Sequence, residues 1–143
     1  MTIKRFLFPK KSYAVPGWVS LGLLITRAGF AASLLTHGWA KLMNFKALAA
    51  GGFPDPIGLG SATAVCLAIF AEFLCSAAVV LGLLHRLALI PMIITMSTAF
   101  FAIHGGHIDG GETAMLYLMA FIALYITGPG RFSADAIIAK KFM

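Results

Sequence analysis

The chain has 143 residues, of which 60% are hydrophobic and 11% are charged, and its net charge is +6. Apolar residues make up only about 45–50% of a typical soluble domain, so this composition excludes a soluble protein and predicts a membrane protein. The positive charge does not indicate nucleic-acid binding, because the basic residues lie mainly at the edges of the apolar runs.

Four apolar runs are long enough to cross a bilayer, whose hydrocarbon core of about 30 Å requires about 20 helical residues. They cover approximately residues 17–38, 60–84, 87–104 and 112–128. The second and third runs joined as one helix would be about twice as long as the bilayer is thick, so we expect a turn at His85 and Arg86. The sequence therefore predicts an all-α fold, a four-helix bundle that forms one transmembrane domain over residues 1–143.

The basic residues are distributed unequally about these four spans. Eight lie on the side of the two termini and two lie on the opposite side. The positive-inside rule then predicts that both termini are cytoplasmic. After the last span, "GPGRFS" ends the helix, and residues 133–143 predict a short amphipathic tail on the membrane surface. The basic residues are Lys4, Arg5, Lys10, Lys11, Arg86, Arg131, Lys140 and Lys141 on the terminal side, and Lys41 and Lys46 on the other.

The first span carries Arg27 in the middle of "LGLLITRAGFAASLL". A charge at that depth costs about 2.5–3.5 kcal/mol on the insertion scale, which its apolar neighbours roughly offset. Glu72 is the one acidic residue deep within any of these spans, and helical rise places both residues about 15–18 Å from the cytoplasmic edge. We therefore predict a buried Arg27–Glu72 ion pair, which either marks a functional path or only fixes the register of the helices.

The first and third spans both end in polar residues on the side of the membrane opposite the termini. "THGWAKL" places His37 and Lys41 on one helical face, and the segment "FKALAAGGFPDPIGLG" that follows predicts a lid-like loop. "AIHGGHIDGGE" ends the third span, and its imidazoles would exchange protons with a bound molecule. Ordinary polar loop chemistry explains these residues equally well, and a metal site is a weak alternative with His104, His107, Asp109 and Glu112 as ligands.

Two tyrosines of the fourth span, Tyr117 and Tyr125, are eight residues apart and lie on nearly the same helical face. Their hydroxyls would line a cavity, or their rings would simply pack in the bundle.

Taken in order, the motifs of this chain resemble those of the DoxX family of small bacterial membrane proteins. They are an arginine in the first span, "HGWAKL", "GGFPDP", Glu72, "LGLLHR", His104 and "GPGRFSAD", and the resemblance covers about residues 20–135. It implies a four-helix bundle in the bacterial inner membrane, related to the DoxD subunit of thiosulfate:quinone oxidoreductase. The recurring polar positions of the family correspond here to Arg27, His37, Lys41, Glu72, Arg86 and His104.

We expect a small component of a membrane redox system that binds a quinone or another apolar molecule inside the bundle. Whether the protein is an enzyme is left open; an enzyme of this kind would be a subunit of a membrane oxidoreductase. The sequence has no haem, flavin or iron–sulfur motif, so the electrons would come from a bound ligand or a redox partner protein. The residues expected to act on the ligand are Arg27, Glu72, His37 and His104 as catalytic groups, with Lys41 and Tyr117 as binding groups.

Two other classes of function compete with this reading. A non-enzymatic scaffold, chaperone or assembly factor would use the polar residues only to fix its fold. A small-solute transporter is less favoured, because four helices without an inverted repeat leave little room for alternating access. Small residues in the first span, Ala28, Gly29, Ala31 and Ala32, permit close helix contact, either within the bundle or in a homo-oligomer.

Overall fold

A computed structural model describes residues 3–142, apart from the side chains of Lys4, Arg5 and Phe142. Within these residues all regular secondary structure is helical, and four helical segments are long and apolar enough to cross a membrane. This confirms the predicted all-α, four-span architecture. The spans are Gly17–Met43, Ser61–Leu81, His85–Ile103 and Ile108–Thr127.

Each span is flanked or interrupted by shorter elements. Two short helices, α1 (Ile3–Leu7) and α2 (Lys10–Tyr13), precede α3 (Gly17–Met43), which is followed by α4 (Phe45–Ala47) and a π-helical turn η1 (Leu48–Gly52). The second span consists of α5 (Ser61–Ile69), η2 (Phe70–Cys75) and α6 (Ser76–Leu81). The last two spans are α7 (His85–Ser97) with η3 (Thr98–Ile103), and α8 (Ile108–Thr127), before the C-terminal helix α9 (Ala134–Phe142).

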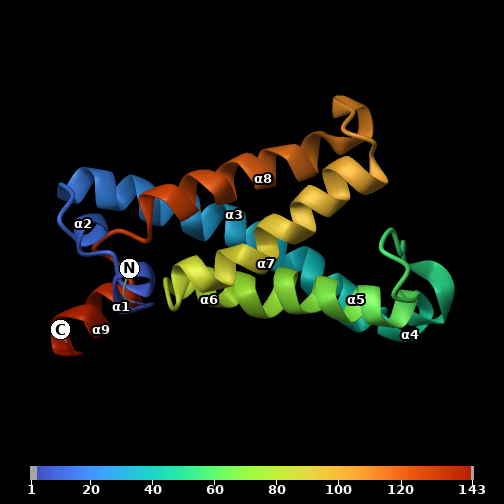
Figure 1. Cartoon of the computed structure of the whole chain (residues 1–143), viewed down its shortest axis with the longest axis horizontal. Helices are drawn as coiled ribbons and strands as arrows, with labels where there is room; N and C mark the ends of the chain where they lie inside the picture. The colour runs from blue at the N-terminus through green and yellow to red at the C-terminus, as the bar shows by residue number, and fades with distance from the viewer. Residues whose placement is uncertain (1–2, 143) are drawn as a thin grey trace.

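The termini lie at the same end of the bundle, where Figure 1 shows α1, α2 and α9 together. From that end α3 runs beside the second span, whereas α7, η3 and α8 diverge from it toward the far end. The loop between α3 and α5 lies at this far end, on the open side of the diverging helices. The cytoplasmic placement of the termini stays a prediction, and two of the basic side chains on which it rests, Lys4 and Arg5, lie outside the described residues.

The turn between the second and third spans lies at residues 82–84, slightly earlier than we predicted. Gly82 ends α6 in the left-handed conformation, with a φ of 69°, which glycine adopts without steric cost. His85 and Arg86 therefore belong to the first turn of α7 instead of the tip. The first span is also longer than predicted, because α3 continues past residue 38 to Met43.

Asp135 fastens the C-terminal helix to this turn. Its carboxylate accepts hydrogen bonds from the backbone N–H groups of Leu84 at 2.8 Å and His85 at 2.9 Å, and its own N–H donates to the carbonyl oxygen of Gly82. These bonds satisfy N–H groups that a helix N-terminus otherwise leaves without partners. Burial raises the pKa of Asp135 above its usual value, although both accepted hydrogen bonds oppose this shift. One face of the predicted surface tail is thus held by the bundle, while Ile137 points outward.

Arg27 lies at the same end as these residues, and its predicted ion pair with Glu72 is wrong. The guanidinium donates hydrogen bonds to the carbonyl oxygens of Pro129 at 2.6 Å and Phe132 at 2.9 Å, and the residue is only 1% exposed. It therefore holds the loop between α8 and α9. Charged donors make hydrogen bonds about twice as strong as neutral ones, so Arg27 binds this loop firmly.

The register of two antiparallel helices explains the error. Gly38 of α3 lies against the backbone of Glu72, and Arg27 comes eleven residues earlier in α3. At a rise of about 1.5 Å per residue, this separates the level of Arg27 from that of Glu72 by roughly 16 Å along the helix. We predicted one depth for the two charges because we assumed that the first two spans reach the same level at the end that holds the termini. In the structure these two helices are shifted along their axes relative to each other.

Candidate functional site

The carboxylate of Glu72 pairs with Lys41. The distance between Lys41 Nζ and Glu72 Oε2 is 2.5 Å, and the two side chains are 22% and 6% exposed. A carboxylate so far from water needs a charged partner, because an isolated buried charge is very costly. Lys41, expected only to bind a ligand, is thus the partner of Glu72, the place that we predicted for Arg27.

Gly38 makes this ion pair possible, although we did not predict a role for this glycine from the sequence. A Cβ atom at position 38 would lie 2.6 Å from both the backbone carbon of Glu72 and the nitrogen of Phe73. Only a glycine lets α3 approach η2 this closely. Lys41 follows one helical turn later and reaches the carboxylate. The signal in the sequence was a glycine inside an otherwise good helix pattern, between His37 and Lys41.

Glu72 belongs to one of two π-helical segments that face each other across the bundle. A π-helix carries one residue more per hydrogen-bonded turn than an α-helix, and such turns occur often at functional sites. Glu72 lies in η2, while Thr98, Ala99 and Ile103 lie in η3. Residues of both segments line one cavity.

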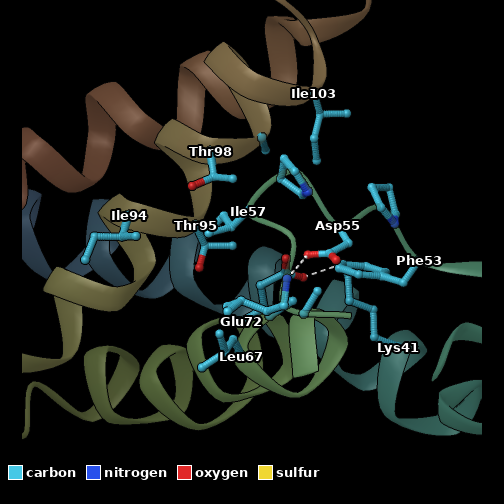
Figure 2. Close-up of a pocket in the computed structure, with 16 residues that line it drawn as sticks. Lys41, Phe53, Asp55, Ile57, Leu67, Glu72, Ile94, Thr95, Thr98 and Ile103 are labelled. Carbon is cyan, nitrogen blue, oxygen red and sulfur yellow. Dashed lines mark hydrogen bonds and ion pairs between the residues drawn. The ribbon is translucent and has the colours of Figure 1, made fainter. Parts of the chain in front are cut away.

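This cavity, which we call the lid cavity, is enclosed by α5 and η2, by α7 and η3, and by residues 53–59 of the loop (Figure 2). Its volume is about 270 Å³ and its wall is mainly apolar. The exceptions are the Lys41–Glu72 pair, Asp55 and two threonines, Thr95 and Thr98, which Figure 2 shows on the α7–η3 side. These two threonines were not among the site residues predicted from the sequence.

Asp55 gives the loop over the lid cavity a defined shape. Its carboxylate accepts hydrogen bonds from the backbone N–H groups of Leu59 at 2.9 Å and Gly60 at 2.6 Å. The Ser61 hydroxyl donates to the carbonyl oxygen of Phe53 at 3.0 Å and closes the base of the loop. The N–H groups of Gly60 and Leu59 lower the pKa of Asp55 below its usual range.

Replacing Asp55 with alanine should therefore loosen the loop without unfolding the bundle. We expect the amide hydrogens of Leu59 and Gly60 to exchange at least about tenfold faster, measured by hydrogen exchange in detergent micelles. Because the folded pKa is lowered, the bonds of the wild-type loop are fully present above the ordinary aspartate pKa of about 3.9 and are lost as the pH falls through the lowered value. Asp109→Ala, at an exposed position in the first turn of α8, is the control; equal exchange in both variants would contradict this role of Asp55.

A second cavity, which we call the histidine cavity, lies on the other side of the Lys41–Glu72 pair. Its volume is about 250 Å³, and both residues of the pair border it as well as the lid cavity. His37 from α3, His104 after η3, and Thr113 and Tyr117 from α8 are the other polar residues of its lining. The structure thus brings five of the six predicted site residues around one cavity, and Arg27 is the exception.

Tyr117 lines this cavity and its ring also packs in the bundle, so the two predicted roles of this residue are not exclusive. Its hydroxyl lies 2.5 Å from Ser33 Oγ, and its ring packs edge-on to that of His37, with centroids 6.2 Å apart. Tyr125 lies elsewhere, where its ring and that of Phe6 contact the guanidinium of Arg86. Arg86 therefore belongs to the end of the bundle that holds the termini.

The weak metal candidates do not form a ligand set. Within residues 3–142, no three His, Cys, Asp or Glu side chains lie close enough together to hold a metal ion. Two glycines with positive φ, Gly105 and Gly106, turn the chain between His104 and His107. The candidate side chains His104, His107, Asp109 and Glu112 are all exposed.

Comparisons with known proteins agree with this architecture. Residues 22–105 match the model of the DoxX family. The chain is 32% identical over 123 residues to a protein named uncharacterized membrane protein Rv3486 of Mycobacterium tuberculosis, and the match covers 75% of each chain. It is 29% identical over 135 residues to inner membrane protein YqjF of Escherichia coli K12, with 85% of this chain and 95% of that protein covered. No solved structure matches the chain.

Proposed function

The chain belongs to the DoxX family, and from this premise we propose that it is a bacterial inner-membrane component of a redox system that binds a quinone-like molecule in the lid cavity. The name of the Escherichia coli relative supports the choice of membrane. The excess of basic residues on the side of the termini supports a cytoplasmic placement of both ends. Electrons would be exchanged with a partner protein.

The observation that carries this proposal is a charged pair at the wall of an otherwise apolar cavity. Ligand sites are mostly hydrophobic, with a few polar groups that fix the orientation of the ligand. Lys41 Nζ donates hydrogen bonds and Glu72 accepts them, so together they suit both forms of a quinone. A quinone carbonyl would accept from Lys41, and the hydroxyl of the reduced ring would donate to Glu72.

The histidine cavity offers a route for the protons that accompany quinone reduction. Glu72 borders both cavities, and His37 and His104 are exposed side chains that border the second one. An imidazole ring carries one nitrogen that can accept a proton and one that can donate it, so either residue can pass protons between Glu72 and the aqueous side. In this proposal Arg27 has no part in the chemistry, because it binds the loop between α8 and α9.

Tryptophan fluorescence provides a test of binding. Trp39 of α3 lies beside Phe73 of η2, with ring centroids 5.8 Å apart, whereas Trp18 lies near the start of α3. In a Trp18→Phe background reconstituted in lipid nanodiscs, decylubiquinone should quench Trp39 with a saturable dependence on concentration. Glu72→Gln and Lys41→Met should each weaken this binding by roughly ten- to a hundredfold, since a hydrogen bond to a charged group contributes about 1.5–3 kcal/mol.

The exchanged pair, Lys41→Glu with Glu72→Lys, separates a ligand site from a scaffold whose ion pair only fixes the fold. It restores the opposite charges, so the fold should survive, but it exchanges the positions of donor and acceptor. We expect its affinity for decylubiquinone to stay reduced. Wild-type affinity in the exchanged variant would favour the scaffold, and the absence of saturable quenching in the wild-type protein would refute the quinone proposal.

A further inference from the structure

The lid cavity has one deeply buried wall and one wall at the surface of the membrane-spanning helices. Glu72 at the buried wall is 4% exposed, whereas Leu67 on α5 is 51% exposed and Ile94 on α7 is 58% exposed. Leu67 and Ile94 nevertheless both line the cavity. Side chains that line a cavity and also face outward mark its mouth, and the helices that carry them are long and apolar enough to span a bilayer.

The arrangement of the helices explains why a mouth forms at this position. Figure 1 shows α7 and η3 diverging from α5 toward the end far from the termini. The loop occupies the far end of this opening, where Phe53, Pro54 and Pro56 line the cavity. Asp55 and Ser61 hold the loop in place through hydrogen bonds to the backbone. Ile57 and Leu59 of the loop also line the cavity and are 65% and 50% exposed, so the loop side is not sealed. Because hydrogen bonds hold the loop in one shape, the side between α5 and α7 is the way in that faces the bilayer and needs no movement of the loop.

The size and polarity of the cavity restrict what enters it. A volume of about 270 Å³ is slightly below the 300–1,000 Å³ range of typical ligand pockets, so it suits one substituted ring and not a ring with a long chain. The ion pair that a ring can meet, Lys41 and Glu72, lies at the buried wall, while Leu67 and Ile94 at the mouth are apolar. Any long apolar substituent must therefore extend outward between these two residues.

We propose that the ligand enters sideways from the bilayer, ring first, and is a lipid-soluble amphiphile whose apolar tail passes between Leu67 and Ile94 and remains among the lipid chains. This rests on the proposed function and specifies its ligand class. The molecule has a small ring that both accepts and donates hydrogen bonds, and a tail that needs no protein pocket. The histidine cavity then serves proton exchange and not entry of the ligand.

A removable block at the mouth tests this entry route. In the full chain carrying Cys66→Ser, which removes the exposed native thiol, and Trp18→Phe, we would introduce Ile94→Cys and label it with benzyl methanethiosulfonate in nanodiscs. Cys75 is buried, 6% exposed, and should not react. The probes are decylubiquinone and the same dimethoxy-methyl-benzoquinone ring without the decyl chain, read by quenching of Trp39. A matched control carries Leu74→Cys, which is 56% exposed on the second span but does not line the cavity.

The labelled Ile94→Cys variant should bind decylubiquinone at least about tenfold more weakly than before labelling, and reduction of the mixed disulfide should restore the affinity. The equilibrium affinity for the tailless ring should change less than about twofold, because the label slows its entry but does not occupy its site at the buried wall. Labelling of Leu74→Cys should change neither affinity. If labelled Ile94→Cys binds decylubiquinone as well as the control does, sideways entry at this position is refuted while quinone binding stands. If neither quinone binds the unlabelled protein, the proposed function itself fails.

Discussion

Replacing Gly38 with alanine should destabilise the bundle by about 1–3 kcal/mol, the usual cost of forcing extra atoms into a packed interior. The added methyl group would lie 2.6 Å from the backbone of Glu72 and Phe73. Backbone atoms cannot rotate away as a flexible side chain can, so α3 must move away from η2. The Lys41–Glu72 distance then increases and the polar wall shared by the two cavities opens. Unfolding by sodium dodecyl sulfate in mixed micelles, followed by circular dichroism, measures the loss.

Gly29 of the same helix provides the matched control. A Cβ atom there has no neighbour within 4 Å, so Gly29→Ala removes helix flexibility without a clash. We expect Gly29→Ala to leave stability unchanged or raise it by up to about 1 kcal/mol, because alanine favours the helix over glycine. Opposite signs at the two positions would show that contact, and not helix propensity, decides the outcome. Equal effects of the two substitutions would contradict the close approach of α3 to η2.

Replacing Arg27 with methionine should cost about 3–5 kcal/mol, which makes it the most damaging single change that we expect. It removes two charge-assisted hydrogen bonds, and it leaves the carbonyl oxygen of Pro129 without this partner at a buried position and that of Phe132 at a partly buried one. It also removes the positive charge that partly offsets the burial of the Asp135 carboxylate. Arg27→Lys should lose part of this stability, because an ammonium group cannot reproduce the planar, two-pronged contact.

Trypsin digestion separates a local effect of Arg27→Met from global unfolding. Arg131 lies in the loop that Arg27 holds, and its side chain is exposed. Without the anchor, we expect cleavage after Arg131 to accelerate under conditions in which circular dichroism still reports folded protein. Arg131→Met is the stability control, and a surface change of this kind should alter the unfolding free energy by less than about 0.5 kcal/mol. A wild-type cleavage rate in Arg27→Met, with unchanged stability, would contradict the anchoring role.

The histidines and the tyrosine near the far end show how much of the site the sequence could indicate. His37 and His104 come from different predicted spans, yet helix direction alone placed them on one side of the membrane, and Tyr117 of a third span lies beside them in the structure. Each span must cross the bilayer once, so chain order assigns every polar group near a span end to one of two sides. Chain order thus gives the side of the membrane on which a residue lies, but not the side chains that it contacts. Whether Glu72 faces Lys41 or Arg27 does not follow from it.

Asp135 illustrates the same limit at the other end. It lies in the first turn of α9, where a negative charge favours the N-terminus of its own helix. In the structure its carboxylate binds the N-terminus of α7 instead, about fifty residues away in the chain. Local rules describe what a side chain does for its own helix. They do not reveal that a neighbouring helix terminus lies closer and needs acceptors for its N–H groups.

By itself, the sequence determined that this is an all-helical membrane protein of the DoxX family with four spans, because the length and apolarity of a bilayer-crossing helix leave few alternatives. Only the tertiary structure decided how far each helix is shifted and rotated against its neighbours. Hydrophobicity places a residue along the membrane normal only approximately, since a lipid environment is nearly uniform around the helix and over many residues of its length. The axial register is set by the contact of Gly38 with η2. In this register Glu72 pairs with Lys41, and Arg27 binds the loop between α8 and α9.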